Sequence, residues 1–374
     1  MNDPSRSRKP FPITAIVSRA PGAAGTLEEV LIAPPRPDEL LVRNVATGIC
    51  HTDIAAMQAR PSPQPIVLGH EGSAIVEAVG DEVEGLAPGD HVIMSYLACG
   101  DCGECASGHQ SSCGQAGRLC FSGARPDGSH ALTSVDGSAL NDRFFGQSSF
   151  AQYSIANRNN VVKVSKDLPL ETLGPLGCGI MTGAGAAWNV LEVETGMSFA
   201  VFGSGAVGLS SLIAARIAGA TRIVAIDRVA SRLELARSLG ATHVIDASRE
   251  DVTEGLRTIA PAGIDRILET TGRADVVQSA VTALAQRGVL AVAAHAEEGV
   301  KLDIRDLILG SRSIRGVAEG GRSAQMNIER ILGHFAKGEF PFDRLIKFYP
   351  YAEFEQAIAD SVSGAVIKPV IRWS

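Results

Sequence analysis

The sequence lacks an excess of basic residues and any long apolar run. Its 34 Lys and Arg stand against 41 Asp and Glu, a net charge of −7. A nucleic-acid-binding protein would show a basic patch instead, so we expect no nucleic-acid partner. The most apolar stretch, residues 201–220, is broken by serines, glycines and Arg216. Because a membrane helix needs roughly 18–20 apolar residues, we expect no membrane segment.

Cysteine is scarce, with seven residues in a chain of 374, and no internal repeat is visible. The first 20 residues carry charge but no apolar core of signal-peptide length, so we expect a cytoplasmic protein. In that reducing compartment, clustered cysteines favour metal binding over disulfides. The length allows two domains, each with its own core.

Four of the seven cysteines fall within positions 99–113, at spacing C-x2-C-x2-C-x7-C: Cys99, Cys102, Cys105 and Cys113. Four thiolates at short spacing suit a tetrahedral zinc ion with no open position, which can order a loop but cannot bind substrate. A disulfide pair and an iron–sulfur cluster are the alternatives. We therefore predict a structural zinc site.

The pattern of apolar and polar residues changes near residue 197. Residues 13–95 contain short β-type runs between turn residues, and a polar segment, 114–143, follows the four cysteines. From about 197 onward, apolar runs alternate with helical patterns such as "SRLELARSLG". This alternation predicts an α/β unit with a parallel sheet and right-handed crossovers.

A glycine-rich loop, "GSGAVG", lies between an apolar run and a helical stretch. Its members are Gly203, Gly205, Ala206, Val207 and Gly208. Glycines at this spacing permit a tight turn, a close approach to a pyrophosphate and tight packing of helix on strand. We predict a dinucleotide site, and the alternative is a purely structural turn.

An acidic residue ends the next apolar run, since Asp227 stands 19 positions after Gly208. A carboxylate there would bind the adenosine ribose and repel a 2′-phosphate, which favours NAD over NADP. Arg228 and Arg232 follow; they either contact the adenosine end or are solvated surface charges.

Three further candidate ligands are dispersed: Cys50 in "GICHTD", His70 in "VLGHEG" and Cys178 in "GPLGCGIMTG". Two thiolates and an imidazole would leave a fourth zinc position open for substrate. Their spacing alone does not join them, since lone buried Cys and His residues are usually structural. Cys120 is expected to be a free thiol.

Together these motifs resemble the zinc-containing alcohol dehydrogenases of the medium-chain dehydrogenase/reductase superfamily. "GHEGSAIVEAVGDEV", "PGDHV", "CGDCGECASGHQSSC", "GICHTD" and "VFGSGAVG" carry the resemblance, and "FFGQSSFAQY" is most similar to the aryl and allylic alcohol branch. The resemblance implies a GroES-like, β-rich catalytic domain over 1–179 and 320–374. It also implies a Rossmann cofactor domain with a doubly wound parallel sheet over 180–319, giving an α/β chain.

The resemblance also implies a role for each site residue. Cys50, His70 and Cys178 would hold a catalytic zinc, and the four-cysteine cluster a second zinc ion. Thr52 would take the substrate proton, and His51 would lie near the cofactor pyrophosphate. Asp53 and Glu71 would support the metal, Thr182 the nicotinamide and Lys368 the phosphates, while Tyr96, Phe144 and Phe145 would line the substrate pocket. Ala55 stands where many members carry the His that ends the proton relay.

The activity implied is hydride transfer between NAD and a primary aromatic or allylic alcohol/aldehyde pair, of the benzyl alcohol or geraniol type. A thiol-dependent (glutathione or mycothiol) formaldehyde dehydrogenase and a broader primary or secondary alcohol dehydrogenase are the nearest alternatives. A zinc-free quinone or enoyl reductase and a non-catalytic role are more distant. We expect a homo-oligomer, with a dimer favoured over a tetramer.

Overall fold

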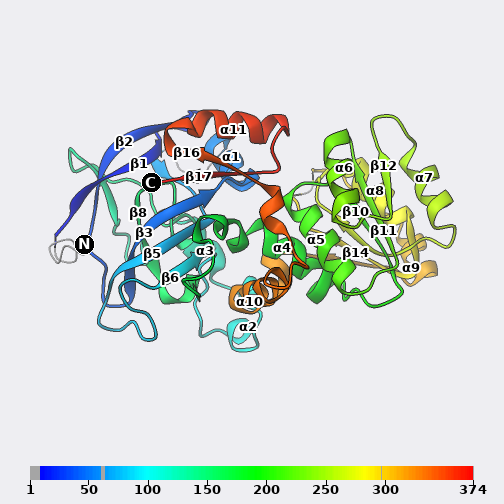
Figure 1. Cartoon of the computed structure of the whole chain (residues 1–374), viewed down its shortest axis with the longest axis horizontal. Coiled ribbons are helices and arrows are strands. Elements are labelled where there is room, and N and C mark those ends of the chain that lie inside the picture. The colour runs from blue at the N-terminus through cyan, green and yellow to red at the C-terminus, as the bar shows by residue number, and fades with distance from the viewer. Residues whose placement is uncertain (1–8, 60–63, 296, 374) are drawn as a thin grey trace. The chain divides into compact units, whose positions relative to one another are not determined.

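A computed structural model describes residues 9–59, 64–295 and 297–373 (Figure 1). The chain forms two compact units, Met1–Cys178 with Asp343–Ser374, and Gly179–Phe342. No helix within the described ranges is long and apolar enough to cross a membrane.

The first unit contains two sheets. A four-stranded sheet has the order β4-β1-β2-β7, with β4 at Ile66–Val67, β1 at Phe11–Ser18, β2 at Gly25–Ile32 and β7 at Leu132–Ser134. A second sheet has the order β16-β17-β3-β5-β6-β9, and β8 also pairs with β3. Its strands are β16 (Ile346–Pro350), β17 (Lys368–Arg372), β3 (Glu39–Gly48), β5 (Gly72–Val79), β6 (His91–Met94), β8 (Tyr153–Asn157) and β9 (Val161–Val164). The helices are α1 (His51–Gln58), α2 (Gly103–Ala106), α3 (Ala116–Phe121) and α11 (Phe354–Ser363).

Alternating apolar residues give β3 and β5 a buried face, as half-buried strands require. Leu40, Val42, Ala74 and Val76 are all buried in one hydrophobic cluster. β3 ends at Gly48, which lies opposite Val370 of β17. The sheet therefore brings the start of α1 and the start of β17 to one end, where the candidate ligands lie.

The second unit is built on a six-stranded parallel sheet, which confirms the predicted α/β architecture. Its order is β12-β11-β10-β13-β14-β15. The strands are β10 (Ser198–Phe202), β11 (Arg222–Asp227), β12 (His243–Asp246), β13 (Ile264–Glu269), β14 (Leu284–Val292) and β15 (Ser313–Gly316). The helices are α4 (Gly179–Gly185), α5 (Ala206–Ile217), α6 (Ala230–Leu239), α7 (Val252–Ile259), α8 (Ala274–Thr282), α9 (Ile304–Gly310) and α10 (Ala324–Phe335).

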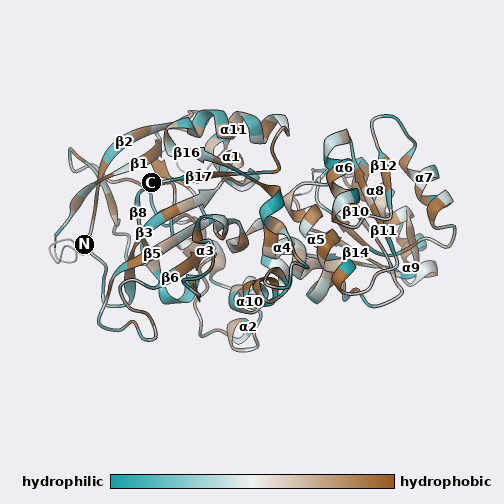
Figure 2. Ribbon diagram, viewed as in Figure 1, coloured by the Kyte–Doolittle hydropathy of each residue, from teal (hydrophilic) through white to brown (hydrophobic). Residues whose placement is uncertain are grey.

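The strand order of this unit reverses direction at β10, between β11 and β13, which is the switch point where doubly wound sheets bind ligands. α5, which follows β10, is largely hydrophobic, whereas α6 carries more polar surface (Figure 2). Leu209, Leu212 and Ile213 of α5 are fully buried. Burial of this helix fixes the loop that precedes it.

The second boundary between the units differs from the predicted one. The sequence predicts that residues 320–374 belong to the first unit, but the structure places 320–342 in the second. Contacts of α10 explain this difference in the boundary. The guanidinium of Arg330, in α10, lies 4.0 Å from the centre of the Trp188 ring. Asn189 also donates a 2.8 Å hydrogen bond to Asn327. These contacts hold α10 to the start of the second unit.

Candidate active site

Four side chains of the first unit converge on one point. Cys50, His70, Glu71 and Cys178 each offer a ligand atom within 4.8 Å of the others. Cys50 lies at the N-terminus of α1, His70 and Glu71 just before β5, and Cys178 at the end of a short 3-10 turn. The fold thus brings together residues that their spacing in the sequence does not join.

Asp53 ties this cluster to α1. Its Oδ2 accepts a 3.0 Å hydrogen bond from the backbone N–H of Cys50, which caps the helix. Its Oδ1 lies 2.9 Å from Nδ1 of His70 and 3.0 Å from the N–H of Gly69. The buried carboxylate therefore fixes the orientation of the imidazole and leaves its Nε2 to bind a metal.

The donor set fits a zinc ion. Nε2 of His70 is buried and has no hydrogen-bond partner among the described residues. Burial would lower the pKa of His70, but the charge and hydrogen bond of Asp53 raise it well above its usual value. A hydrogen bond from Cys178 and the positive charge of Lys368 lower the pKa of the Cys50 thiol well below its usual range. Two thiolates and one imidazole match the ligands of catalytic zinc sites.

Lys368 belongs to this cluster, and its expected contact with the cofactor phosphates stays a prediction. Its Nζ lies 2.8 Å from Oε1 of Glu71 and 3.2 Å from the carbonyl of Ile49, and the side chain is buried. Burial raises the pKa of Glu71, and the ammonium of Lys368 opposes that rise. The sequence did not signal this pair, because nearly 300 residues separate its members.

Two polar residues of α1 follow the first candidate ligand. Thr52 Oγ1 lies 3.7 Å from Sγ of Cys50, and Thr52 is half-buried. His51 is exposed. Ala55, also exposed, offers no proton acceptor. A hydroxyl near the metal ligands and a solvent-facing imidazole beside it suit transfer of a proton to water.

Aromatic rings cover His70. The ring of Phe145 is stacked on the imidazole, with centroids 4.4 Å apart and an interplanar angle of 22°. Phe144 meets the same imidazole edge-on at 5.5 Å. Phe121 of α3, which is 58% exposed, contacts both rings. Tyr96 is buried in the same unit. Phe144 and Phe145 thus lie against His70, a contact that the sequence did not indicate, and their expected place in the substrate pocket stays a prediction.

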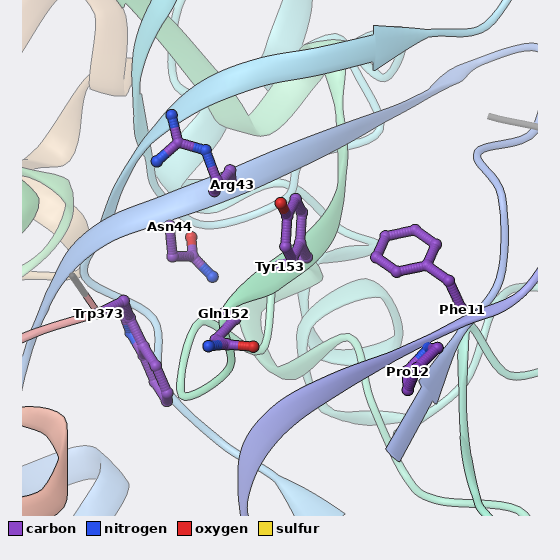
Figure 3. Close-up of a pocket in the computed structure, with 7 residues that line it drawn as sticks. All are labelled: Phe11, Pro12, Arg43, Asn44, Gln152, Tyr153 and Trp373. Atoms are coloured by element: carbon purple, nitrogen blue, oxygen red, sulfur yellow. The ribbon is translucent and has the colours of Figure 1, made fainter. Parts of the chain in front are cut away.

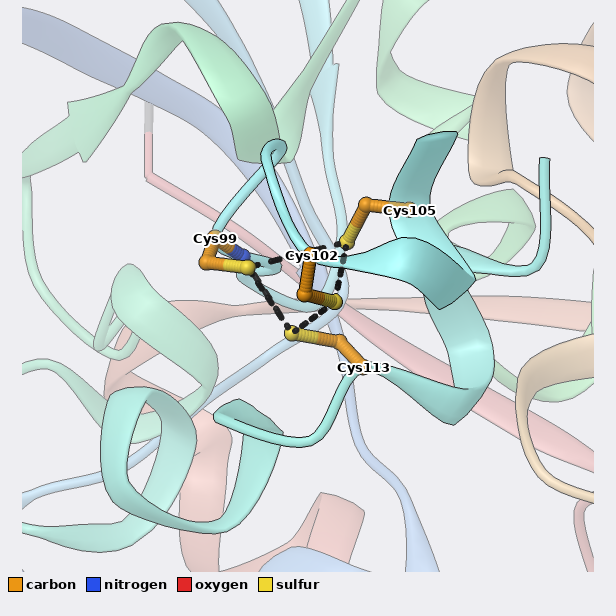
Figure 4. A group of neighbouring side chains, drawn as sticks. All are labelled: Cys99, Cys102, Cys105 and Cys113. Atoms are coloured by element: carbon orange, nitrogen blue, oxygen red, sulfur yellow. Dashed lines mark hydrogen bonds between the residues drawn. The ribbon is translucent and has the colours of Figure 1, made fainter. Parts of the chain in front are cut away.

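The four-cysteine cluster forms a second candidate metal site. The sulfurs of Cys99, Cys102, Cys105 and Cys113 point toward one another (Figure 4). Neighbouring Sγ atoms lie 3.5 to 4.0 Å apart. Four sulfurs bound tetrahedrally at about 2.3 Å from one zinc ion would stand about 3.8 Å apart. A disulfide needs about 2.05 Å between its two sulfurs, and the four thiolates of an iron–sulfur cluster are divided among two or more irons. The geometry therefore fits a single zinc ion.

The glycine loop of the second unit fits a dinucleotide. Gly203 has φ +94°, and a Cβ on Gly208 would stand 1.9 Å from the carbonyl oxygen of Gly203. A Cβ on Gly205 would meet no atom of the described chain within 4 Å, so its backbone borders open space. Gly205 caps α5, whose first N–H groups and positive dipole end suit a pyrophosphate.

Asp227 ends β11 beside this loop. Its Oδ2 accepts a 2.6 Å hydrogen bond from the N–H of Ser204, and its Oδ1 accepts hydrogen bonds from Arg228 and Val229. Arg232 lies 3.9 Å from the same carboxylate, and the Arg228 side chain is exposed. Thr182 is buried in α4 of the same unit. Ala206 and Val207 form the first turn of α5.

A separate hollow of about 240 Å³ lies elsewhere on the first unit (Figure 3). Its lining residues are Phe11, Pro12, Arg43, Asn44, Gln152, Tyr153 and Trp373. Arg43 donates to Glu77 at 2.7 Å, and Trp373 donates to Thr47 at 3.2 Å. This described lining contains no thiol, imidazole or carboxylate, so we assign no reaction to the hollow.

A three-ligand metal site in one unit and a dinucleotide loop in the other define the class of metal-dependent dehydrogenases. Comparison with known families gives the same answer. Residues 36–166 match the alcohol dehydrogenase GroES-like domain, and residues 206–336 match the zinc-binding dehydrogenase domain. The chain belongs to the zinc-binding alcohol dehydrogenase family, and the cofactors of that family are zinc and NAD.

Individual relatives cover nearly the whole chain. Geraniol dehydrogenase of Castellaniella defragrans is 43% identical over 96% of each chain. The crystal structure of benzyl alcohol dehydrogenase from Acinetobacter calcoaceticus is 45% identical, with a TM-score of 0.94, over 97% of this chain and 100% of that one. An alcohol dehydrogenase zinc-binding domain protein from Burkholderia ambifaria is 50% identical, with a TM-score of 0.95, over 97% and 99%. These similarities confirm the predicted resemblance to the aryl and allylic branch.

Proposed function

We propose that this enzyme oxidises primary aromatic or allylic alcohols to aldehydes with NAD, and that it catalyses the reverse reduction. The observation that carries this proposal is the aromatic cover of the metal site: Phe144 and Phe145 both contact His70, and Phe121 extends the cover to the surface. Flat rings favour flat, conjugated substrates, by about 0.5–1.5 kcal/mol for each aromatic contact beyond burial. The names of two relatives, geraniol and benzyl alcohol dehydrogenase, support the same substrate class.

We propose that Cys50, His70 and Cys178 hold the catalytic zinc and that the four-cysteine cluster holds a structural one. When bound, zinc supplies a Lewis acid that lowers the pKa of an alcohol hydroxyl, and NAD supplies the hydride acceptor. The chain's own residues orient and deprotonate the substrate. Asp53 holds the imidazole of His70, and Lys368 balances the buried charge of Glu71.

Thr52 is the proposed proton acceptor. Its hydroxyl lies 3.7 Å from the Cys50 sulfur. Because Thr52 can pass its own proton onward while it accepts one, it can act as a relay without becoming charged. Ala55 has no titratable group, so we propose that the exposed His51 or water completes the path to solvent. The cofactor would be bound by the loop at Gly203–Gly208, with Asp227 at the adenosine ribose.

Steady-state reduction of NAD with benzyl alcohol, geraniol and ethanol tests the substrate class. We expect kcat/KM for the first two alcohols to exceed that for ethanol by at least about tenfold, since each ring contact contributes up to about a factor of ten. A clear preference for ethanol would contradict the proposal. Oxidation of formaldehyde that requires glutathione or mycothiol would favour the thiol-dependent alternative instead.

We propose further that the protein is a cytoplasmic homodimer. None of its seven cysteines is bonded to another, as a reducing compartment favours. β15 stands at the end of the parallel sheet, and the nearby helix α9 exposes Ile304, Ile308 and Leu309 by 59%, 70% and 68%. An edge strand beside exposed apolar side chains suits pairing with a second copy. Light scattering is expected to give twice the chain mass for the wild type. The variant I308D, which places a charge on this exposed apolar surface, is expected to give the mass of a monomer.

A further inference from the structure

One segment, Gln147–Phe150, binds the chain that leads to His70. It hydrogen-bonds four consecutive carbonyl oxygens of the stretch Val67–His70. Val67 accepts from Ser148 Oγ at 2.6 Å, Leu68 from the Phe150 N–H at 2.9 Å, Gly69 from the Ser149 N–H at 2.9 Å, and His70 from Gln147 Nε2 at 2.9 Å. The backbone of the candidate ligand is therefore set by a segment about 80 residues away in sequence.

Among the side chains of this segment, that of Gln147 makes the most hydrogen bonds. Its side chain is buried, at 2% exposure. Besides the carbonyl of His70, its Nε2 donates to the carbonyl of Ser95 at 3.0 Å, and its Oε1 accepts from the N–H of Gly72 at 3.2 Å. Both N–H groups and the oxygen of the amide are thus used. This one side chain binds the backbone at His70 and again at Gly72, and it ties this stretch to the end of β6.

The turn that contains Gln147 has an unusual backbone. Arg143, Phe145 and Ser148 have φ of 66°, 54° and 49°, a left-handed conformation that costs free energy for residues other than glycine. Surrounding contacts hold the turn. Asn160 donates to the carbonyl of Gly146 at 3.1 Å, and a Cβ on Gly146 would stand 2.6 Å from Cβ of Leu97. The result of this conformation is that the ring of Phe145 lies flat on His70.

We infer that Gln147 and Phe145 are positioning residues that fix the plane of the His70 imidazole, Gln147 through the backbone and Phe145 through the ring face. With Asp53 on Nδ1, the ring is then held at three points before any ion binds. Phe145 accordingly holds the metal ligand in place as well as forming part of the aromatic cover of the metal site. This inference rests on the proposed catalytic zinc at Cys50, His70 and Cys178.

Release of zinc to a chromophoric chelator tests the inference, because the four-cysteine site provides an internal control in the same molecule. In the folded, zinc-loaded protein, Gln147→Met removes all three hydrogen bonds at similar volume, and Phe145→Leu removes the stack. We expect both variants to release one zinc ion about ten times faster than the wild type, as loss of outer partners of a metal ligand does, while the second ion leaves at the wild-type rate. Phe145→Tyr keeps the ring face and should restore slow release.

Gln152→Met is the matched control, since the side chain of this half-buried glutamine of the same unit accepts its hydrogen bond from the Thr14 N–H of β1 rather than from the stretch that carries His70. It should release both ions at the wild-type rate. Cobalt substituted into the catalytic site offers a second readout, and its visible spectrum should change in Gln147→Met and Phe145→Leu.

Wild-type release rates and an unchanged cobalt spectrum in both variants would overturn the inference. Faster release of both ions together would overturn it as well, because that result would indicate general loosening of the unit. If Gln147→Met does not fold, the comparison of Phe145→Leu with Phe145→Tyr decides. A wild-type protein with only one zinc ion would instead contradict the proposed function, so the two failures are distinguishable.

Discussion

Nζ of Lys368 and Oε1 of Glu71 lie 2.8 Å apart, and both side chains are almost fully buried. Removal of one partner leaves a buried charge without compensation. We therefore expect Lys368→Met to lower the free energy of unfolding by about 3–5 kcal/mol, as for other broken buried ion pairs. Urea denaturation at neutral pH measures the change. The double variant Glu71→Gln, Lys368→Met should recover most of the loss, and a double variant as unstable as the single one would contradict this account.

The hydroxyl of Thr52 should decide the rate of the chemical step. Thr52→Ala removes the proposed proton acceptor, and we expect kcat with benzyl alcohol and NAD to fall about 100-fold or more. Thr52→Ser keeps the hydroxyl and should retain activity within a few-fold of the wild type. Steady-state kinetics on both variants makes the comparison. Equal activity of the Ala and Ser variants would show that the proton leaves by another route.

The four-cysteine cluster should hold one zinc ion that orders its loop. Cys105→Ser removes one of four sulfurs whose neighbouring members lie 3.5 to 4.0 Å apart. We expect the zinc content to fall from two ions to one per chain, because a closed tetrahedral site depends on all four ligands. Elemental analysis counts the ions, and limited proteolysis should then cut within residues 99–121. A variant that keeps two ions and resists the protease would contradict the assignment.

Asp142 should make stability depend on pH. Burial raises the pKa of this carboxyl from 3.8 to about 6, although it accepts a 2.8 Å hydrogen bond from the Leu132 N–H. Between these two values the folded protein binds more protons than the unfolded chain. The contribution of Asp142 to stability is therefore fully present below pH 3.8 and is lost as the pH rises to about 6.

Thermal unfolding of Asp142→Asn and of the wild type between pH 4 and 7 measures this effect. The variant carries no ionisable group at position 142. We expect the Tm of the wild type to fall relative to that of the variant as the pH rises through this window. A constant difference across the range would show that the carboxyl titrates at its ordinary value.

Local motifs were predictable from the sequence, because the residues that act together in each motif lie close together in the chain. The cysteines at 99–113 and the loop at Gly203–Gly208 have spacings that the chemistry itself fixes. The α/β unit was also predictable, since its apolar runs and helical patterns alternate. The catalytic set was reached only through the family resemblance, as Cys50 and Cys178 lie 128 positions apart.

Contacts between distant segments were not predictable. The stack of Phe145 on His70 depends on a left-handed backbone that residues other than glycine seldom adopt, and no periodicity in "FFGQSSF" indicates it. Gln147 gave no signal either, because its side chain binds segments that lie more than 50 residues away in the sequence. The pairing of Lys368 with Glu71 depends on how β17 pairs with β3, which the sequence does not specify. The sequence also assigned α10 to the wrong unit. The contact that holds this helix to the second unit joins Arg330 to Trp188, which lie far apart in the sequence.

The central claim is that Cys50, His70 and Cys178 hold a zinc ion on which turnover depends. The most direct test is zinc analysis combined with NAD reduction by benzyl alcohol, for the wild type and for Cys178→Ser. We predict two zinc ions and turnover in the wild type, and one ion with turnover reduced at least about 100-fold in the folded variant. A Cys178→Ser protein that retains two ions, or that turns over at the wild-type rate, would contradict the account.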